Sequence, residues 1–423
     1  MKILAYTSPA RGHLYPIVPI LDELARRGHA IAVRTLASQV GLMAGRGFDA
    51  APIAPAIEAI EHDDYLGRTP PGRLKRGMAT FGARSIHEVG DLHEAIAERR
   101  PDALLIDCMT WGATAAAEAW GGPWAQWFPF PLPLPSRDAP PFGPGFKPAA
   151  GLPGRLRDRL LGPILLRTYE SAAVPPLNEM RRAVGVPPLA GAHEVFTAAP
   201  LLLYMTAQPF EYPRSDWPAS VRMVGPCAWD PPADTPPWLD EVRRPLVLVS
   251  TSSEFQDDGR LARNALEALA GENVEVVATV PSAQLPESVP DNARVERFVP
   301  HGPILARAAC AITHGGAGAT QKALAAGVPV CVVPFGRDQL EIARRVEVAG
   351  AGTRLPAWRL SAARLRAAVR VAMTKREGAR RVAKGYRATG GAAAAADAFE
   401  SLAAAWSRGS DSSVSGGPTI SIP

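Results

Sequence analysis

A histidine near one strand end and an aspartate at another suggest proton-transfer chemistry. His13 follows Gly12 in the loop TSPARGH, after the first apolar run, and Asp107 ends the run ALLID. A neutral imidazole can take a proton from a hydroxyl, and a carboxylate stabilises the charge that the imidazole gains. Because ligands bind outside the carboxyl ends of strands in a parallel sheet, we expect both residues at one edge. The pattern predicts a His13–Asp107 base; a purely structural histidine is the alternative.

A glycine-rich turn supplies a second signal, suited to phosphate. Thr313–Thr320 reads THGGAGAT, follows an apolar strand and opens a helix predicted over Gln321–Ala326. Glycines let the backbone approach a ligand, and a helix N-terminus offers free N–H groups and partial positive charge to phosphate. His314 adds a side-chain donor. A turn that only allows tight strand–helix packing fits the spacing equally well.

Strand and helix patterns alternate along the chain, which is typical of α/β proteins with parallel sheets. We therefore predict two Rossmann-like halves that face a cleft. Their strands and first helices are predicted at Lys2–Tyr6, Pro16–Arg27, Ala30–Leu36, Ala103–Asp107, Ala113–Trp120, Leu246–Ser250, Val274–Val280, Ala309–Thr313 and Val328–Pro334.

Shifts in composition mark the divisions of the chain. We predict an N-terminal domain over residues 1–207 and a Pro- and Trp-rich linker over 208–245. A second domain is predicted over 246–408, followed by a low-complexity, disordered tail over 409–423.

Composition and missing motifs exclude several functions. The 423 residues carry a net charge of +5 without a basic stripe, so nucleic acid is not an expected partner. The four cysteines form no CxxC pair, which predicts neither a zinc cage nor disulfides and fits a reducing cytoplasm. No signal peptide and no run of 18 apolar residues occur, so we expect a soluble protein without stable membrane insertion.

Further motifs are missing that other phosphate enzymes use. The chain has no GxxxxGK[ST] loop and no GxGxxG after its first strand, which disfavours kinases and dehydrogenases. It has no Asp-x-Asp for a metal-bridged diphosphate, and the run Glu61–Asp64 is interpreted as solvated charge. We therefore predict no metal site.

The C-terminal motifs also occur together in a known family. Phe298–His301 (FVPH), HGGAG, GVP and the pair Asp338–Gln339 follow in order, after the loop VSTSSEFQ. The chain resembles the inverting glycosyltransferases of the natural-product and UDP-sugar group, which have the GT-B fold. This resemblance covers most of the chain and is strongest from about residue 244 to 355.

The resemblance implies a role for each matching residue. It gives His13 and Asp107 the general-base roles, Phe298, Val299 and His301 contact with the base of the donor, and Asp338 and Gln339 contact with the sugar hydroxyls. The diphosphate would be bound by Ser253, His314, Gly315, Gly316, Gly318 and Ala319. Two purely structural alternatives stay open: a helix N-cap role for Asp338 and a core position for Phe298.

Acceptor contacts are expected from aromatic segments of the N-terminal half. Loops in such segments shape the acceptor pocket in the family, and ligand pockets are mostly apolar with few polar anchors. Core packing of the second and third aromatic residues is the alternative. The candidates are Trp111, Trp127 and Phe128, with a Gly-, Pro- and Arg-rich loop at Leu66–Arg84.

Two positions depart from the family pattern. Ala319 lacks the usual hydroxyl, and Lys322 stands where a ribose-binding glutamate is usual. A lysine only donates hydrogen bonds and is positive, so it cannot replace a carboxylate. Lys322 either turns toward phosphate or pairs with a nearby acid.

The resulting hypothesis is sugar transfer with inversion from a UDP- or dTDP-sugar to a hydroxyl of a small apolar natural-product acceptor. The nucleotide-sugar is a co-substrate, and no cofactor is expected. The alternatives are a sugar-nucleotide epimerase and a non-catalytic or partner-dependent binding protein. An auxiliary protein or a homodimer is compatible with each of these.

Overall fold

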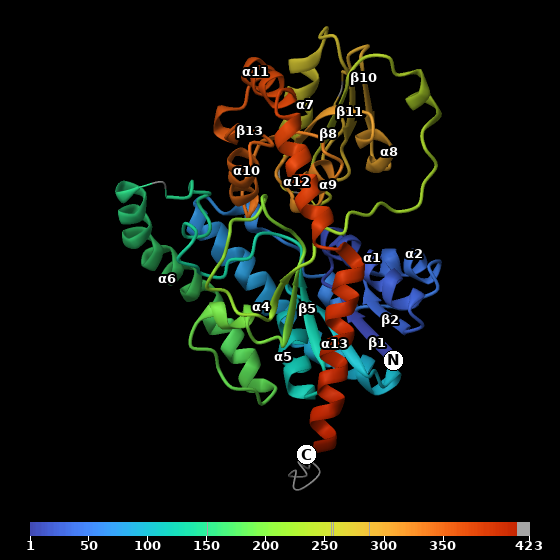
Figure 1. The fold of residues 1–423 in the computed structure, drawn as a ribbon, viewed down its shortest axis with the longest axis vertical. Helices are drawn as coiled ribbons and strands as arrows, with labels where there is room; N and C mark the ends of the chain where they lie inside the picture. The colour runs from blue at the N-terminus through green and yellow to red at the C-terminus, as the bar shows by residue number, and fades with distance from the viewer. Residues whose placement is uncertain (150, 255, 257, 287, 413–423) are drawn as a thin grey trace.

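The computed structural model describes residues 1–149, 151–254, 256, 258–286 and 288–412. These residues form two parallel sheets with covering helices, one in each half of the chain (Figure 1). The predicted pair of Rossmann-like halves is confirmed. None of the described helices is long and apolar enough to span a bilayer.

The N-terminal sheet has the strand order β3-β2-β1-β4-β5-β6-β7. Its order reverses between β1 and β4, so the loops after these two strands open side by side at one edge. The elements are β1 (Lys2–Tyr6), α1 (Arg11–Arg26), β2 (Ala30–Thr35), α2 (Val40–Ala44), β3 (Asp49–Pro52), α3 (Pro55–Glu58), α4 (Pro70–Arg99), β4 (Ala103–Asp107), α5 (Trp111–Trp120), β5 (Trp124–Phe128), α6 (Leu152–Ala183), β6 (Leu201–Tyr204) and β7 (Val221–Met223).

The C-terminal sheet repeats this arrangement with the order β10-β9-β8-β11-β12-β13. The loops after β8 and β11 meet at its switch point. The elements are β8 (Leu246–Ser250), α7 (Gly259–Leu269), β9 (Glu275–Thr279), β10 (Ala293–Glu296), α8 (His301–Leu305), β11 (Ala308–Thr313), α9 (Ala317–Ala325), β12 (Val330–Val332), α10 (Gln339–Val348), β13 (Gly352–Arg354), α11 (Ala362–Met373), α12 (Arg376–Ala388) and α13 (Gly391–Ser412).

The predicted loop at Leu66–Arg84 is wrong, because most of it belongs to the 30-residue helix α4. Pro70 and Pro71 occupy the first helical positions, where proline lacks only an N–H that has no helical partner. Thr69 caps the helix by accepting a hydrogen bond from the N–H of Gly72 at 3.2 Å. These prolines therefore start a helix here.

Helix α1 begins five residues before the predicted start, at Arg11. Pro16 and Pro19 lie inside it, where proline normally weakens a helix. A buried stripe that includes Leu14 and Ile17 outweighs this cost through packing on the sheet. The early start puts His13 in the first helical turn.

Chain segments cross between the halves. The predicted linker segment, 208–245, contributes the edge strand β7 to the N-terminal sheet. Helix α13 returns to the N-terminal half, where Phe399 is fully buried in its core and Arg27 bonds Asp397 and Glu400 at 2.6 and 2.7 Å (Figure 1). The helix includes the first four residues of the predicted tail, and 413–423 lie outside the described residues.

A buried ion network also ties the halves together. Arg345 of α10 donates to both carboxylate oxygens of Glu211, which follows β6, at 3.1 Å each. Arg345 bonds Glu341 at 2.7 Å, and Glu341 accepts the N–H groups of Gly143 and Gly145 at 2.8 and 2.9 Å. Each buried charge has a partner of opposite sign, so the network defines how the halves face each other.

Candidate active site

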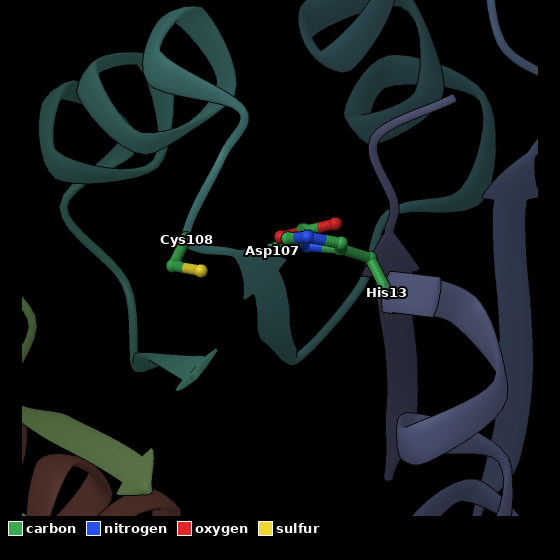
Figure 2. A group of neighbouring side chains, drawn as sticks. All are labelled: His13, Asp107 and Cys108. Carbon is green, nitrogen blue, oxygen red and sulfur yellow. The ribbon is translucent and has the colours of Figure 1, made fainter. Parts of the chain in front are cut away.

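The predicted base pair is in direct contact. Nδ1 of His13, in the first turn of α1, lies 2.8 Å from Oδ1 of Asp107 at the end of β4 (Figure 2). The Asp107 side chain is fully buried, whereas 18 % of the His13 side chain is exposed. Pairing through Nδ1 leaves Nε2 free to accept a proton from a substrate hydroxyl.

Asp107 is held by further donors. Its Oδ2 accepts the N–H of Ser8 at 2.9 Å and the Ser8 hydroxyl at 2.6 Å. Its Oδ1 also accepts the N–H of Met109 at 3.0 Å. Since every one of these neighbours donates, the carboxylate is locked in its ionised form and orients the imidazole.

The pKa values of the pair fit a base and its supporting acid. Burial lowers the pKa of His13, but the charge and hydrogen bond of Asp107 outweigh it, so the net shift is upward. Burial raises the pKa of Asp107, but the charge and hydrogen bond of His13, together with hydrogen bonds from Ser8 and Met109, bring it below its ordinary value. The negative charges of Glu254 and Asp338, in the C-terminal half, also raise the pKa of His13. Charges on the far side of the interface between the halves therefore act on the imidazole.

Cys108 lies beside this pair, and its sulfur, the Asp107 carboxylate and the imidazole of His13 fall within 4.8 Å of one another (Figure 2). Three such groups invite comparison with a metal site. Burial and the neighbouring Asp107 raise the pKa of the Cys108 thiol well above its usual range, however, so it stays protonated at neutral pH. With the carboxylate oxygens of Asp107 already bonded, the chemistry of this group favours proton transfer.

The predicted acceptor residues lie in the core of the N-terminal half. Trp127 is fully buried in the cluster that contains Ile3 and Leu14, and its indole N–H donates to the carbonyl of His13 at 3.2 Å. Trp111 and Phe128, 4 % and 1 % exposed, belong to a second buried cluster. Trp127 therefore supports the backbone that carries the base.

The aromatic ring at the imidazole is one that the sequence did not single out. Phe130 is half-buried, and its centroid lies 5.4 Å from that of His13 and 4.4 Å from that of Phe128. It lies in the segment Trp124–Pro135 that the sequence marked as aromatic. No local signal separated it from its neighbours, because the strand β5 ends at Phe128 and all five of its residues are buried.

In the C-terminal half, His314 follows β11 at the N-terminus of α9. Its Nδ1 lies 3.4 Å from the carbonyl of Ser250 and 4.0 Å from Oδ2 of Asp258. Burial lowers the pKa of His314, although Asp258 and the Ser250 carbonyl counteract it. Because Nδ1 faces two acceptors, it carries the proton of the neutral ring, and Nε2 donates only once the ring is protonated, which the charge of a nearby diphosphate would favour. The N-terminal N–H groups of α9 lie beside this ring, as in known phosphate sites.

The glycines of this turn differ in what they permit. Gly315 has φ +95°, and a Cβ there would meet Cβ of Gln339 at 2.9 Å, so only glycine fits. A Cβ on Gly316 would lie 2.4 Å from Nε2 of His314, whereas one on Gly318 would meet nothing within 4 Å. The half-buried Ala319 follows in the first turn of α9.

This contrast predicts a matched pair of variants. Gly316→Ala is expected to displace the imidazole of His314 and to weaken nucleotide diphosphate binding about tenfold, the loss of roughly one hydrogen bond to a charged group. The control Gly90→Ala, at an exposed position inside α4 where a Cβ would also meet nothing within 4 Å, should bind normally and be slightly more stable, since alanine favours helices. Calorimetric titration measures both; equal affinity in the two variants would contradict the role of His314.

The other residues predicted to contact the nucleobase and the phosphates of the donor lie around the same edge of the C-terminal sheet. Ser253 is exposed in the loop after β8, and Phe298 is 53 % exposed, so Phe298 is no core residue. Val299 is buried. Nε2 of His301 is hydrogen-bonded to the hydroxyl of Thr279 at 3.1 Å. Burial and the charge of Lys322 lower the pKa of His301 to about 4.

The predicted sugar contacts open helix α10. Asp338 is the N-cap residue, but its side chain accepts no capping hydrogen bond from the described backbone. Burial raises its pKa to about 6, although Arg337 and His13 counteract this. Gln339 is buried, accepts the N–H of Phe335 at 2.7 Å and donates to Gln256 at 2.6 Å. Asp338 is therefore the freer of the two to meet a ligand.

Lys322 is paired with an acid. Its Nζ lies 2.5 Å from Oδ1 of Asp230, which belongs to the predicted linker segment, 208–245. Oδ2 of Asp230 accepts the N–H of Gly302 at 2.8 Å. Burial raises the pKa of Asp230, but Lys322 outweighs it and lowers the net value. Sequence reasoning missed Asp230, because a proline-rich segment carries no local signal for a contact with α9.

A second residue missed from sequence joins the halves at the site. Arg337 donates to both carboxylate oxygens of Asp64 in the N-terminal half, at 3.0 and 2.7 Å, and to Glu254 at 3.1 Å. It has φ +51°, a strained value for arginine. With this backbone conformation the side chain of Arg337 reaches across the interface to Asp64, from the position directly before Asp338.

Known proteins are similar to the chain over nearly its whole length. Residues 263–398 match the erythromycin biosynthesis protein CIII-like, C-terminal domain. Over 419 residues the chain is 34 % identical to 4'-demethylrebeccamycin synthase of Lentzea aerocolonigenes, covering 95 % of this chain and 99 % of that protein.

Solved structures agree on the fold. The calicheamicin glycosyltransferase CalG4 is similar with a TM-score of 0.72 and 23 % identity, covering 95 % of this chain and 98 % of that one. Glycosyltransferase VinC, solved in complex with dTDP, has a TM-score of 0.67 and 22 % identity, covering 96 % and 100 %. The predicted GT-B fold is confirmed.

Proposed function

The chain belongs to the family of natural-product glycosyltransferases, and we propose that it transfers a sugar from a UDP- or dTDP-sugar to a hydroxyl of a small apolar acceptor. The observation that carries this proposal is the contact of His13 with Asp107, at the edge where the imidazole senses Glu254 and Asp338 of the opposite half. That arrangement brings a base to the side from which a sugar bound near Asp338 would be attacked.

The proposed reaction is a single displacement with inversion. Nε2 of His13 takes the acceptor hydroxyl proton as that oxygen attacks the anomeric carbon, and Asp107 stabilises the imidazolium. The bond between the anomeric carbon and the diphosphate oxygen breaks as the new bond forms. The nucleoside diphosphate leaves with the electron pair.

The leaving diphosphate would be stabilised by the N-terminus of α9 and by His314, without a resident metal. Asp338 would accept hydrogen bonds from the sugar hydroxyls, with Gln339 behind it. Phe130 and the surrounding aromatic residues would contact the apolar acceptor beside the imidazole.

The test is transfer by the purified protein from α-linked UDP- and dTDP-sugars to a panel of hydroxylated aromatic aglycones, with and without EDTA. The proposal expects a β-linked product by NMR, formed equally with the chelator. A retained α-linkage would contradict the displacement, and loss of activity in EDTA would contradict metal independence. Nucleotide binding without transfer to any acceptor would favour the non-catalytic, partner-dependent alternative, which the departures at Ala319 and Lys322 motivate.

Donor binding is predicted to depend on the Lys322–Asp230 pair. Lys322→Glu would set two carboxylates against each other in place of an ion pair, so we expect at least a tenfold loss of affinity for the preferred diphosphate among UDP, dTDP, GDP and ADP. The double variant Lys322→Glu with Asp230→Lys reverses the pair and should recover part of it. Titration calorimetry measures both. Tighter binding by the single variant would show that a carboxylate from α9 itself is required.

A further inference from the structure

Helix α6 exposes an apolar face that the catalytic proposal does not use. Leu152, Leu156, Leu160 and Ile164 follow at intervals of four residues, and their exposed fractions are 79, 58, 60 and 61 %. Large apolar side chains are usually buried, and an exposed row of them marks an interaction surface. At 1.5 Å per residue the row is about 18 Å long.

The same face carries positive charge. Residues three and four apart lie together on a helix, and the residue three positions after each apolar one is exposed: Arg155, Arg159, Pro163 and Arg167. No acid lies on this face between residues 152 and 167 of the described chain; Asp158 is half-buried and bonded to Arg157 at 2.8 Å. We call the eight residues the α6 face.

The position of the helix leaves the α6 face available. The fully buried residues of α6 begin at Ala173, so its first half extends beyond the core (Figure 1). Its second half packs in the buried cluster that holds Trp111 and Phe128. The exposed first half of α6 therefore projects from the N-terminal half of the protein.

We propose that the α6 face binds an anionic lipid surface. Leucine and isoleucine would enter the boundary between headgroups and acyl chains, while the arginine stems follow them and the guanidinium groups bond lipid phosphates. Leucines four residues apart advance about 40° per step, so the row spreads around the helix as a broad face, which suits a lipid surface better than a narrow seam between helices.

Charge complementarity excludes a second copy as the preferred occupant. A two-fold contact would place the same face against itself, so Arg155 and Arg159 would meet arginines. An anionic surface instead neutralises all three arginines and covers the apolar row. The inference does not depend on the proposed transfer reaction, because its test needs no donor or acceptor.

The test is co-sedimentation of the full chain with vesicles of phosphatidylcholine alone and of an equal mixture with phosphatidylglycerol. We expect binding to the anionic vesicles that weakens in high salt. Arg155→Glu with Arg159→Glu should reduce the partition coefficient at least about 25-fold, or fivefold per arginine. Leu156→Ser with Leu160→Ser should reduce it about tenfold or more.

The matched control replaces exposed residues elsewhere, Arg263→Glu with Val371→Ser, and should sediment like the wild type. Unchanged circular dichroism and nucleotide affinity confirm that each variant is folded. Absence of vesicle binding, or binding that the α6 variants do not alter, overturns the proposal. Self-association that is lost in the leucine variant, without vesicle binding, identifies a second copy as the occupant and also overturns it.

Discussion

His13→Ala is expected to lower kcat for sugar transfer by about 10²–10⁴-fold and to leave nucleotide affinity nearly unchanged. The imidazole is the partly exposed member of the dyad and its free Nε2 can meet an acceptor hydroxyl, whereas the carboxylate of Asp107 is fully buried. The nucleotide site lies on the other half, around His314, so its binding should survive. Steady-state transfer and calorimetric titration with the same preparation measure the two quantities.

The matched control is His29→Ala. His29 is also paired with a carboxylate, at 2.7 Å from Glu400, but in the contact between α1 and α13 regions, away from the site. It should keep full activity and lose at most some stability. If His13→Ala transfers sugar at the rate of His29→Ala, His13 is not the base.

Asp107→Asn is expected to lower kcat by about 10³–10⁴-fold. Replacing the buried aspartate of a Ser-His-Asp triad by asparagine has an effect of this order. Asparagine has one acceptor oxygen, whereas Asp107 accepts from His13, Ser8 and Met109. The amide N–H group of the new asparagine would face one of these three donors. The imidazole of His13 would lose both its orientation and the negative charge that stabilises it. Single-turnover transfer measures the loss.

The pH profile gives this prediction a sign. Transfer needs neutral His13, so the wild-type rate should rise with pH through the raised pKa of the imidazole. Without the charge of Asp107 the burial effect, which lowers that pKa, prevails. The rising limb in Asp107→Asn should therefore move to lower pH even though the plateau falls.

Asp91→Asn is the control for this variant. Asp91 is also buried and accepts from the Tyr6 hydroxyl at 2.7 Å and the N–H of Ala54 at 3.1 Å, outside the dyad. It should destabilise the fold comparably without moving the limb. A limb that stays in place in Asp107→Asn would contradict the assignment of the titrating base to His13.

Local patterns were most informative where an element is short and buried. The strands at Lys2–Tyr6, Ala103–Asp107 and Leu246–Ser250 match residue for residue, because continuous apolar runs bounded by turn residues leave little freedom in register. The stretch from Leu66 was misread as a loop, since its glycines, prolines and arginines are offset by tertiary packing of α4. Helix α6, with three internal prolines, was missed for the same reason.

By itself the sequence determined the α/β class, the two halves, the family and the identity of the dyad candidates. The class and the two halves follow from local hydrophobic patterns, the dyad candidates from polar residues at strand ends, and the family from a resemblance carried by several short motifs. Only the tertiary structure decided that Nδ1 of His13 meets Asp107, that Phe130 and not Trp127 lies at the imidazole, and that Lys322 pairs with Asp230, 92 residues earlier. These contacts arise where separate loops converge at sheet edges, and the packing that brings them together leaves no periodic trace in the chain.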